Sequence, residues 1–238
     1  MTSDAINRQV AVLSVTEPFW THAVTTLSDV AGLTRIATRE ELRNCLREHA
    51  HFDLMLIAHW RWAIPEDVLV AWRCVGFHTS PLPWGRGGSP IQNQILRGLY
   101  KSEVCAFRPT NEMDAGDIYL RRPINLETGS IEKILDRVAQ LSAEMARVIL
   151  LEDPVPEAQR GTTSTLQRLS PPNSELSLAA LNARQIYDRI RMVDGFDYPR
   201  AFLRHSGWIL EFTDGQLEDD RVSAKVTFKQ IDGDGTNA

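Results

Sequence analysis

The sequence predicts an α/β protein with a doubly wound parallel, Rossmann-like sheet and a small C-terminal β-rich module. Strand-like runs at residues 10–15 and 52–58 alternate with segments of helical pattern, which is the order typical of a parallel sheet. The second run is the strongest strand signal, because strands buried on both faces consist of consecutive apolar residues. Strand-like segments recur near 208–212 and 222–228 and predict the separate C-terminal module.

The other elements of the first half follow in chain order. Residues 18–33 predict a loop and a helix, and residues 34–37 a second strand. Thr38 and Glu41 have the spacing of a capping box, which predicts a helix over 39–48. The first strand-to-helix turn lacks the Gly-x-Gly-x-x-Gly pattern, so we expect no nicotinamide dinucleotide site.

The second half is predicted to form one long helix, a linker and a small module. Apolar residues recur at three- and four-residue spacing over 131–151, which predicts a helix that covers one face of the sheet. The proline-rich stretch after it places a first domain at 1–155, a linker at 156–178 and an α+β module at 179–238. Residues 233–238 are expected to be disordered.

Composition and charge restrict the class of protein. The 238 residues are 43% hydrophobic and 24% charged, as in a globular chain with a sizeable core. The net charge of −5 argues against a nucleic-acid-binding surface, which usually carries a basic stripe. No apolar run has the length of a membrane span, and the polar N-terminal residues show no signal-peptide pattern. We therefore expect a cytoplasmic protein that binds neither nucleic acid nor membrane.

The three cysteines, Cys45, Cys74 and Cys105, have no Cys-x-x-Cys spacing. That spacing is typical of zinc sites, so no metal site is expected. An odd cysteine count without a secretory signal fits reduced thiols in the cytoplasm.

Residues 74–98 form the centre of the predicted site. The apolar run 74–77 is typical of the end of a buried strand, and it delivers His78 to the carboxyl edge of the sheet, where open α/β sheets bind ligands. A loop rich in proline and glycine follows and carries Arg86, a candidate to contact an anionic group. Pro90 then begins a helix. The alternative interpretation is a structural histidine followed by a turn.

A second polar cluster follows another apolar run, Val104 to Phe107. Asp114 and Asp117 lie on either side of a glycine there. A carboxylate next to an imidazole orients the ring, stabilises its protonated form and changes its pKa. These carboxylates are therefore candidates for contact with His78, and Asp117 is expected to brace the turn.

Two tryptophans, Trp60 and Trp62, follow the predicted strand 52–58. Aromatic rings at the carboxyl end of a strand could stack on a flat heterocycle such as a pterin. Packing of the two rings against the next helix is an equally favoured alternative.

Two sequence strings resemble the motifs of the N10-formyltetrahydrofolate-dependent formyltransferases. They are His-x-Ser-x-Leu-Pro-x-x-Arg-Gly, starting at His78, and Asp-x-Gly-Asp, starting at Asp114. This family includes methionyl-tRNA formyltransferase and the sugar N-formyltransferases. The longer string that ends Arg-Gly-Gly-Ser-Pro-x-Gln-Asn, with Trp-x-Trp-x-Ile-Pro-Glu from Trp60, resembles most closely the sugar enzymes of the pseudaminic-acid pathway type. The resemblance covers roughly residues 10–215.

The resemblance implies an N-formyltransferase with the formyltransferase sheet and with N10-formyltetrahydrofolate as co-substrate. It implies transfer of a formyl group to a primary amine of a nucleotide-linked amino sugar. His78 is then the general base, and Asp114 orients its ring and adjusts its pKa. The residues implied to bind the cofactor are Trp60, Trp62, Ile64, Met113 and Asp114. Those expected to contact the substrate are Ser80, Pro81, Arg86 and Gly87.

One position departs from the family pattern. The wider family has an asparagine two residues before the histidine, where it holds the formyl oxygen, and this chain has Gly76. Backbone N–H groups, a water or Asn93 are the candidates to replace it, so Asn93 joins the candidate catalytic residues.

Other functions stay open at this point: formyl transfer to an aminoacyl-tRNA or an amino acid, hydrolysis of formyltetrahydrofolate, and folate binding without catalysis. The acidic net charge and the short C-terminal module favour a small substrate over tRNA. The amino sugar, its nucleotide and the amine are not determined by the sequence. A homodimer that pairs exposed strands of the C-terminal module is also left open.

Overall fold

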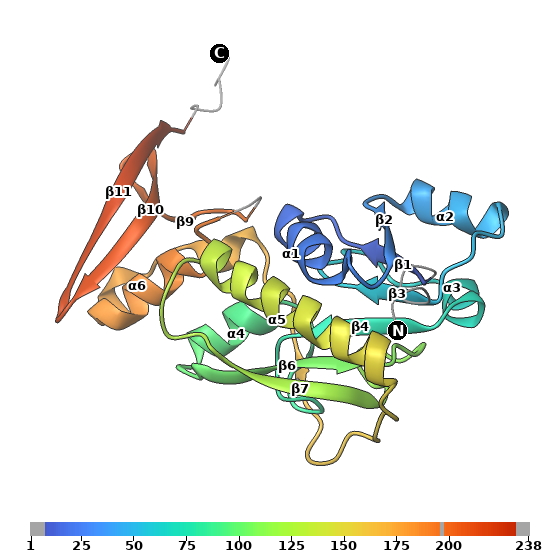
Figure 1. Cartoon of the computed structure of the whole chain (residues 1–238). Helices are drawn as coiled ribbons and strands as arrows, with labels where there is room; N and C mark the ends of the chain where they lie inside the picture. Colours follow the sequence, from blue (N-terminus) through green and yellow to red (C-terminus); the bar gives the residue numbers. More distant parts are fainter. Residues whose placement is uncertain (1–7, 196–197, 232–238) are drawn as a thin grey trace. The chain divides into compact units, whose positions relative to one another are not determined.

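The computed structural model of the chain describes residues 8–195 and 198–231 (Figure 1). The chain divides into two compact units, which are described separately. The first unit consists of Met1–Pro90, Lys101–Asn125 and Leu135–Leu166, and the second of Ile91–Tyr100, Leu126–Ile134 and Gln167–Ala238. The domain boundaries expected from the sequence stay a prediction, and the expectation for residues 233–238 lies outside the described residues.

A six-stranded sheet in the order β2-β1-β3-β4-β6-β7 forms the first unit. Four neighbouring strands are parallel, which confirms the predicted α/β fold class with its parallel-dominated sheet. The last two strands run antiparallel along one edge, where Figure 1 shows β6 and β7 side by side. The strands are β1 (Gln9–Leu13), β2 (Gly32–Ile36), β3 (Leu54–Ile57), β4 (Cys74–His78), β6 (Lys101–Phe107) and β7 (Ile118–Asn125).

Helices alternate with these strands, as the sequence pattern predicts. They are α1 (Glu17–Leu27), α2 (Arg39–Arg47), α3 (Glu66–Ala71), α4 (Pro90–Leu96) and α5 (Ile131–Glu152). The capping box of α2 is confirmed: Thr38 Oγ1 accepts the Glu41 N–H, and the Glu41 carboxylate accepts the Thr38 N–H. None of the helices among the described residues is long and apolar enough to cross a membrane.

Residues 157–166, here called the strap, belong to the first unit. Glu157 forms an isolated bridge with Ile118. The short strand β8 (Thr165–Leu166) then pairs with β5 (Arg86–Gly87), which lies in the loop after β4. The strap therefore fixes the loop that carries Arg86.

The second unit contains a three-stranded antiparallel sheet in the order β11-β10-β9, which confirms the predicted β-rich C-terminal module. Two short 3-10 turns, Pro171–Ser174 and Leu178–Ala180, precede the helix α6 (Ala183–Arg191). The helix packs against the sheet formed by β9 (Ala201–His205), β10 (Trp208–Glu218) and β11 (Arg221–Gln230).

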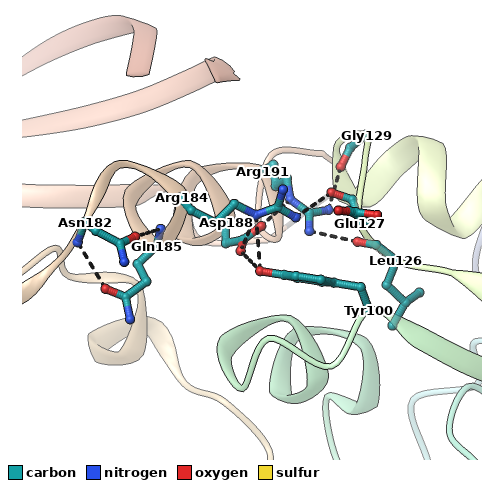
Figure 2. Close-up of polar contacts among 9 residues, drawn as sticks. All are labelled: Tyr100, Leu126, Glu127, Gly129, Asn182, Arg184, Gln185, Asp188 and Arg191. Atoms are coloured by element: carbon teal, nitrogen blue, oxygen red, sulfur yellow. Dashed lines mark hydrogen bonds and ion pairs between the residues drawn. The ribbon is translucent and has the colours of Figure 1, made fainter. Parts of the chain in front are cut away.

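A buried ion pair holds α6 in the second unit (Figure 2). Arg191 Nε donates to Asp188 Oδ1 at 2.7 Å, and its other nitrogens donate to the carbonyls of Leu126 and Gly129. The Tyr100 hydroxyl donates to Asp188 Oδ2 at 2.5 Å. Burial, with the Asp188 carboxylate, raises the pKa of Tyr100, so the hydroxyl keeps its proton and stays a donor. These contacts connect α6 to Tyr100 and to the turn before α5.

We expect Asp188→Ala to lower the free energy of unfolding by about 3–5 kcal/mol, because it leaves the buried Arg191 charge without a partner. Urea denaturation followed by circular dichroism measures this. Asp136→Ala is the control, since it removes an exposed ion pair with His22 and should cost no more than about 1 kcal/mol. An equal loss of unfolding free energy in the two variants would mean that the buried pair of Asp188 and Arg191 stabilises the protein no more than an exposed pair.

Candidate active site

The structure brings His78 and Asp114 together at the carboxyl end of β4. His78 is the last residue of this strand, and its side chain is buried. The His78 Nδ1 atom lies 3.5 Å from Asp114 Oδ2. The side chains of His78 and Asp114 are 8% and 19% exposed, so both lie largely away from bulk water. A carboxylate in this place orients the ring and stabilises a positive charge on it.

The loop after β4 contacts both members of this pair. The other ring nitrogen of His78, Nε2, lies 2.8 Å from the Gly85 carbonyl oxygen. The Gly87 N–H donates to Asp114 Oδ2 at 2.8 Å. A carbonyl oxygen only accepts, so the hydrogen bond to Gly85 places a proton on Nε2. Both ring nitrogens thus face acceptors, an arrangement in which a doubly protonated ring forms two favourable contacts.

Backbone geometry explains the position of Asp114. Its φ of 51° lies in the left-handed region, which aspartate tolerates better than most residues. Two residues later, a Cβ at Gly116 would overlap the carbonyl of Arg108, so only glycine fits there. Gln159 of the strap donates to the carbonyls of Asp114 and Gly116 at 2.7 and 2.8 Å. The turn is therefore held from both sides.

Arg86 is engaged by protein groups of the same unit. Its Nε and Nη2 atoms donate to Gln159 Oε1, and Nη1 lies 2.8 Å from the exposed Glu112. Gln159 thus connects the Arg86 loop to the Asp114 turn, a role that the sequence analysis missed because only the folded strap brings it there. The predicted contact of Arg86 with an anionic substrate group stays a prediction.

The residues after β3 form an aromatic pair. The ring centroids of Trp60 and Trp62 lie 4.9 Å apart in an edge-to-face arrangement. Trp60 and Ile64 pack against a hydrophobic core cluster, whereas Trp62 is 38% exposed. The buried Trp60 Nε1 atom lacks an acceptor among the described residues. Trp60 therefore packs against the core and Trp62 is partly exposed, and the contact of Trp60, Trp62 and Ile64 with a cofactor stays a prediction.

His59 is a further residue at this edge to which the sequence analysis gave no role. Ile57 of β3 lies opposite Gly76 of the parallel strand β4. His59 comes two residues after Ile57 and His78 two residues after Gly76, so both histidines lie at the same edge of the sheet. Burial, and next the charge of Arg61, lowers the pKa of His59 to about 4. The His59 ring is therefore neutral near pH 7.

The remaining predicted substrate and cofactor residues have other surroundings. Ser80 is buried, and its hydroxyl donates to the carbonyls of Trp84 and Gly85, which stabilises the loop. Pro81 is half-buried in this loop, and Met113 is 67% exposed beside Asp114. Their contacts with substrate or cofactor stay predictions.

Asn93 lies in the second unit, and its side-chain amide is already engaged there. Its Nδ2 donates to the Gln167 carbonyl and its Oδ1 accepts from Arg97, both at 2.8 Å. The proposed role of Asn93 at the formyl oxygen stays a prediction.

Phe107 explains why the chain has glycine at position 76. Gly76 lies opposite Phe107 in the antiparallel pair of β4 and β6. A Cβ atom at Gly76 would lie 2.8 Å from two carbons of the Phe107 ring and 3.3 Å from Pro109 Cγ. The phenyl ring therefore fills the space in which a side chain at position 76 would start.

Comparison with known proteins places this arrangement in a family. The family model described as "Formyl transferase" matches residues 21–149, and that described as "Methionyl-tRNA formyltransferase, C-terminal domain" matches residues 171–229. The chain is 33% identical to a methionyl-tRNA formyltransferase of Acidiphilium cryptum over 69% of its own length and 57% of that protein. The chain spans 32% to 57% of the length of the curated relatives that it matches.

Solved structures give the same result. A methionyl-tRNA formyltransferase from Clostridium thermocellum superposes with a TM-score of 0.88 at 31% identity, covering 94% of this chain and 99% of that one. A sugar N-formyltransferase from a Shewanella species superposes with a TM-score of 0.63 at 15% identity, covering 92% and 96% of the two chains. The second similarity is one of fold alone.

We expect Gly76→Asn to lower the free energy of unfolding by about 1–3 kcal/mol, because the new side chain overlaps the Phe107 ring. The same substitution in a Phe107→Ala background should cost clearly less, since the ring is gone. A double-mutant cycle measured by urea denaturation gives the coupling between the two positions. Equal costs in both backgrounds would mean that Phe107 does not limit position 76.

Proposed function

The chain belongs to the formyl transferase family, and we propose that it transfers a formyl group from N10-formyltetrahydrofolate to a primary amine of a nucleotide-linked amino sugar. The observation that carries this proposal is the His78–Asp114 pair, largely buried at the carboxyl end of β4. Open α/β sheets bind ligands at this edge. The expected location is the cytoplasm.

In this proposal His78 is the general base and Asp114 its orienting partner. The amine attacks the formyl carbon, and His78 accepts the amine proton directly or after the attack. The bond between the formyl carbon and N10 then breaks, and His78 returns a proton to N10 as tetrahydrofolate leaves. In the structure Nε2 donates to the Gly85 carbonyl, so it already carries a proton. Before Nε2 can accept the amine proton, this hydrogen bond has to open and the ring has to change to the neutral tautomer whose proton is on Nδ1, the nitrogen that faces Asp114. Asp114 then faces the positively charged ring through Nδ1, which lowers the energy of that state.

The negative charge that develops on the formyl oxygen needs hydrogen-bond donors. A single donor in such a place commonly contributes about 3 kcal/mol to the stability of the transition state. With Gly76 at the family's asparagine position, we assign this role to backbone N–H groups or to Asn93.

The residues proposed to hold the carrier suit a flat heteroaromatic group. Trp62 is partly exposed and its ring contacts that of Trp60, which packs with Ile64 against a core cluster. The Trp60 indole N–H lacks a protein acceptor among the described residues. Met113 and Asp114 are the other two residues that we assign to the carrier. When bound, N10-formyltetrahydrofolate supplies the formyl group.

Formyl transfer to an aminoacyl-tRNA is the second candidate. It is favoured by the match of residues 171–229 to a methionyl-tRNA formyltransferase domain and by the Clostridium thermocellum structure. The net charge of −5 and the motif from His78 to Asn93 favour the nucleotide-linked amino sugar, with Arg86 and Gly87 near its anionic groups.

A substrate panel distinguishes the two candidates. We expect formylated product, detected by mass spectrometry, with at least one of the UDP-, dTDP-, GDP- and CMP-linked amino sugars, and none with methionyl-tRNA. Product only with methionyl-tRNA would establish the second candidate instead. Release of formate without any amine would identify a hydrolase, and folate binding without turnover an inactive relative.

We expect His78→Ala to lower the rate of formyl transfer by about 10²–10⁴-fold, the usual contribution of a general base. The apparent affinity for the folate should change little, because the proposed carrier site uses other residues. His22→Ala is the control, since the His22 ring pairs with the exposed Asp136 among the described residues. Turnover of His78→Ala within a few-fold of the unmodified protein would remove His78 from the reaction.

A further inference from the structure

The side-chain amide of Gln159, in the strap, forms four hydrogen bonds, the full number that such a group can form. Its Oε1 atom accepts from Nε and Nη2 of Arg86 at 3.2 and 2.9 Å. Its Nε2 atom donates to the carbonyls of Asp114 and Gly116 at 2.7 and 2.8 Å. A guanidinium only donates and a carbonyl only accepts, so these partners fix which end of the amide faces each of them.

The donor end of the amide holds the turn that places Asp114. This residue has a φ of 51°, in a region that side chains rarely adopt without support from their surroundings. Its carboxylate lies 3.5 Å from His78 Nδ1 and accepts the Gly87 N–H at 2.8 Å. Two hydrogen bonds from Gln159 to the backbone of this turn therefore help to fix the distance between the carboxylate and the His78 ring.

The acceptor end of the amide orients Arg86 without balancing its charge, because an amide is neutral. Among the residues that the structure describes, the carboxylate paired with Arg86 is that of Glu112, whose side chain is 75% exposed, so solvent weakens this pair. The contacts with Gln159 and Glu112 use three of the five guanidinium N–H groups. The guanidinium is thus held in place with its positive charge and two N–H groups available to an anion.

We propose that Gln159 is a positioning residue of the reaction, which sets the spacing between the Asp114 carboxylate and the Arg86 guanidinium. Because Asp114 faces His78, this spacing is also the one between the general base and the group that binds the anion. It favours substrates whose amine and anionic group lie at the matching separation. The inference rests on the proposed function, and Gln159 acts through Asp114 and Arg86 rather than on the reacting atoms.

Gln159→Glu changes both ends of the amide with almost no change in size. The new carboxylate still accepts from Arg86 but balances its charge, and it cannot donate to the two carbonyls. We expect kcat to fall about 10–100-fold, because the general base and its partner lose their alignment. The KM for the UDP-, dTDP-, GDP- or CMP-linked amino sugar that gives product should rise about 10-fold, because a charged hydrogen bond to the substrate is weakened. The KM for the folate should change little.

Ala158→Glu is the matched control. It adds the same charge to the strap at the neighbouring exposed position and leaves the amide of Gln159 in place. We expect its kcat and both KM values to stay close to those of the unmodified protein.

Amide hydrogen exchange, followed by NMR on the full chain without substrate, tests the positioning independently of turnover. The Gly87 N–H donates to Asp114, whereas the next N–H, that of Gly88, donates to the Leu166 carbonyl of β8. In Gln159→Glu we expect the Gly87 N–H to exchange about 10-fold faster, because its acceptor is displaced. The Gly88 N–H should keep its rate, since β5 and β8 stay paired. Both rates are read from the same sample.

Two exchange results would overturn the proposal. One is an unchanged rate at Gly87, and the other is an equal acceleration at Gly87 and Gly88, which would mean that the substitution merely detaches the strap. In an active enzyme, unchanged kcat and KM in Gln159→Glu would also overturn it. If the unmodified protein formylates none of the amino sugars, the proposed function fails, and faster exchange at Gly87 alone would still support the positioning of Asp114 by Gln159.

Discussion

The candidate site depends on the loop that holds His78 and Asp114 together. The Gly85 carbonyl contacts one ring nitrogen of His78, and the Gly87 N–H donates to the Asp114 carboxylate that faces the other. The backbone groups of Gly85 and Gly87, two residues apart in the loop, therefore help to hold His78 Nδ1 and Asp114 Oδ2 at their distance of 3.5 Å. A shift of this loop would change both the orientation of the ring and the position of the carboxylate.

Close backbone approach is the constraint behind this loop. Gly87 has a φ of 98°, and a Cβ atom there would lie 2.7 Å from the Leu166 carbonyl of the strap. Only glycine allows β5 to pair with β8 at this separation. The strap in turn supplies Gln159, whose amide contacts Arg86 and the Asp114 turn. The glycines of this loop therefore allow it to pack against the strap, in addition to any role in binding a ligand.

The second unit follows a different principle. A fully partnered polar network around Asp188 and Arg191 fixes α6, and buried charges are tolerated there because each finds hydrogen-bonding partners. Its sheet, by contrast, leaves apolar side chains of β10 and β11 exposed. A three-stranded sheet with one helix is too small to cover both of its faces.

Local patterns in the sequence determined the fold class, the α2 capping box and the place of His78 at the end of a strand, because periodicity and capping act over a few residues. The loop motif and the Asp-x-Gly-Asp string also indicated the family. Only the tertiary structure decided that β6 and β7 run antiparallel, that residues 157–166 form a strap, and that Phe107 fills the space beside Gly76. These features depend on contacts between segments distant in the chain, and short-range sequence patterns do not encode which distant segment is met.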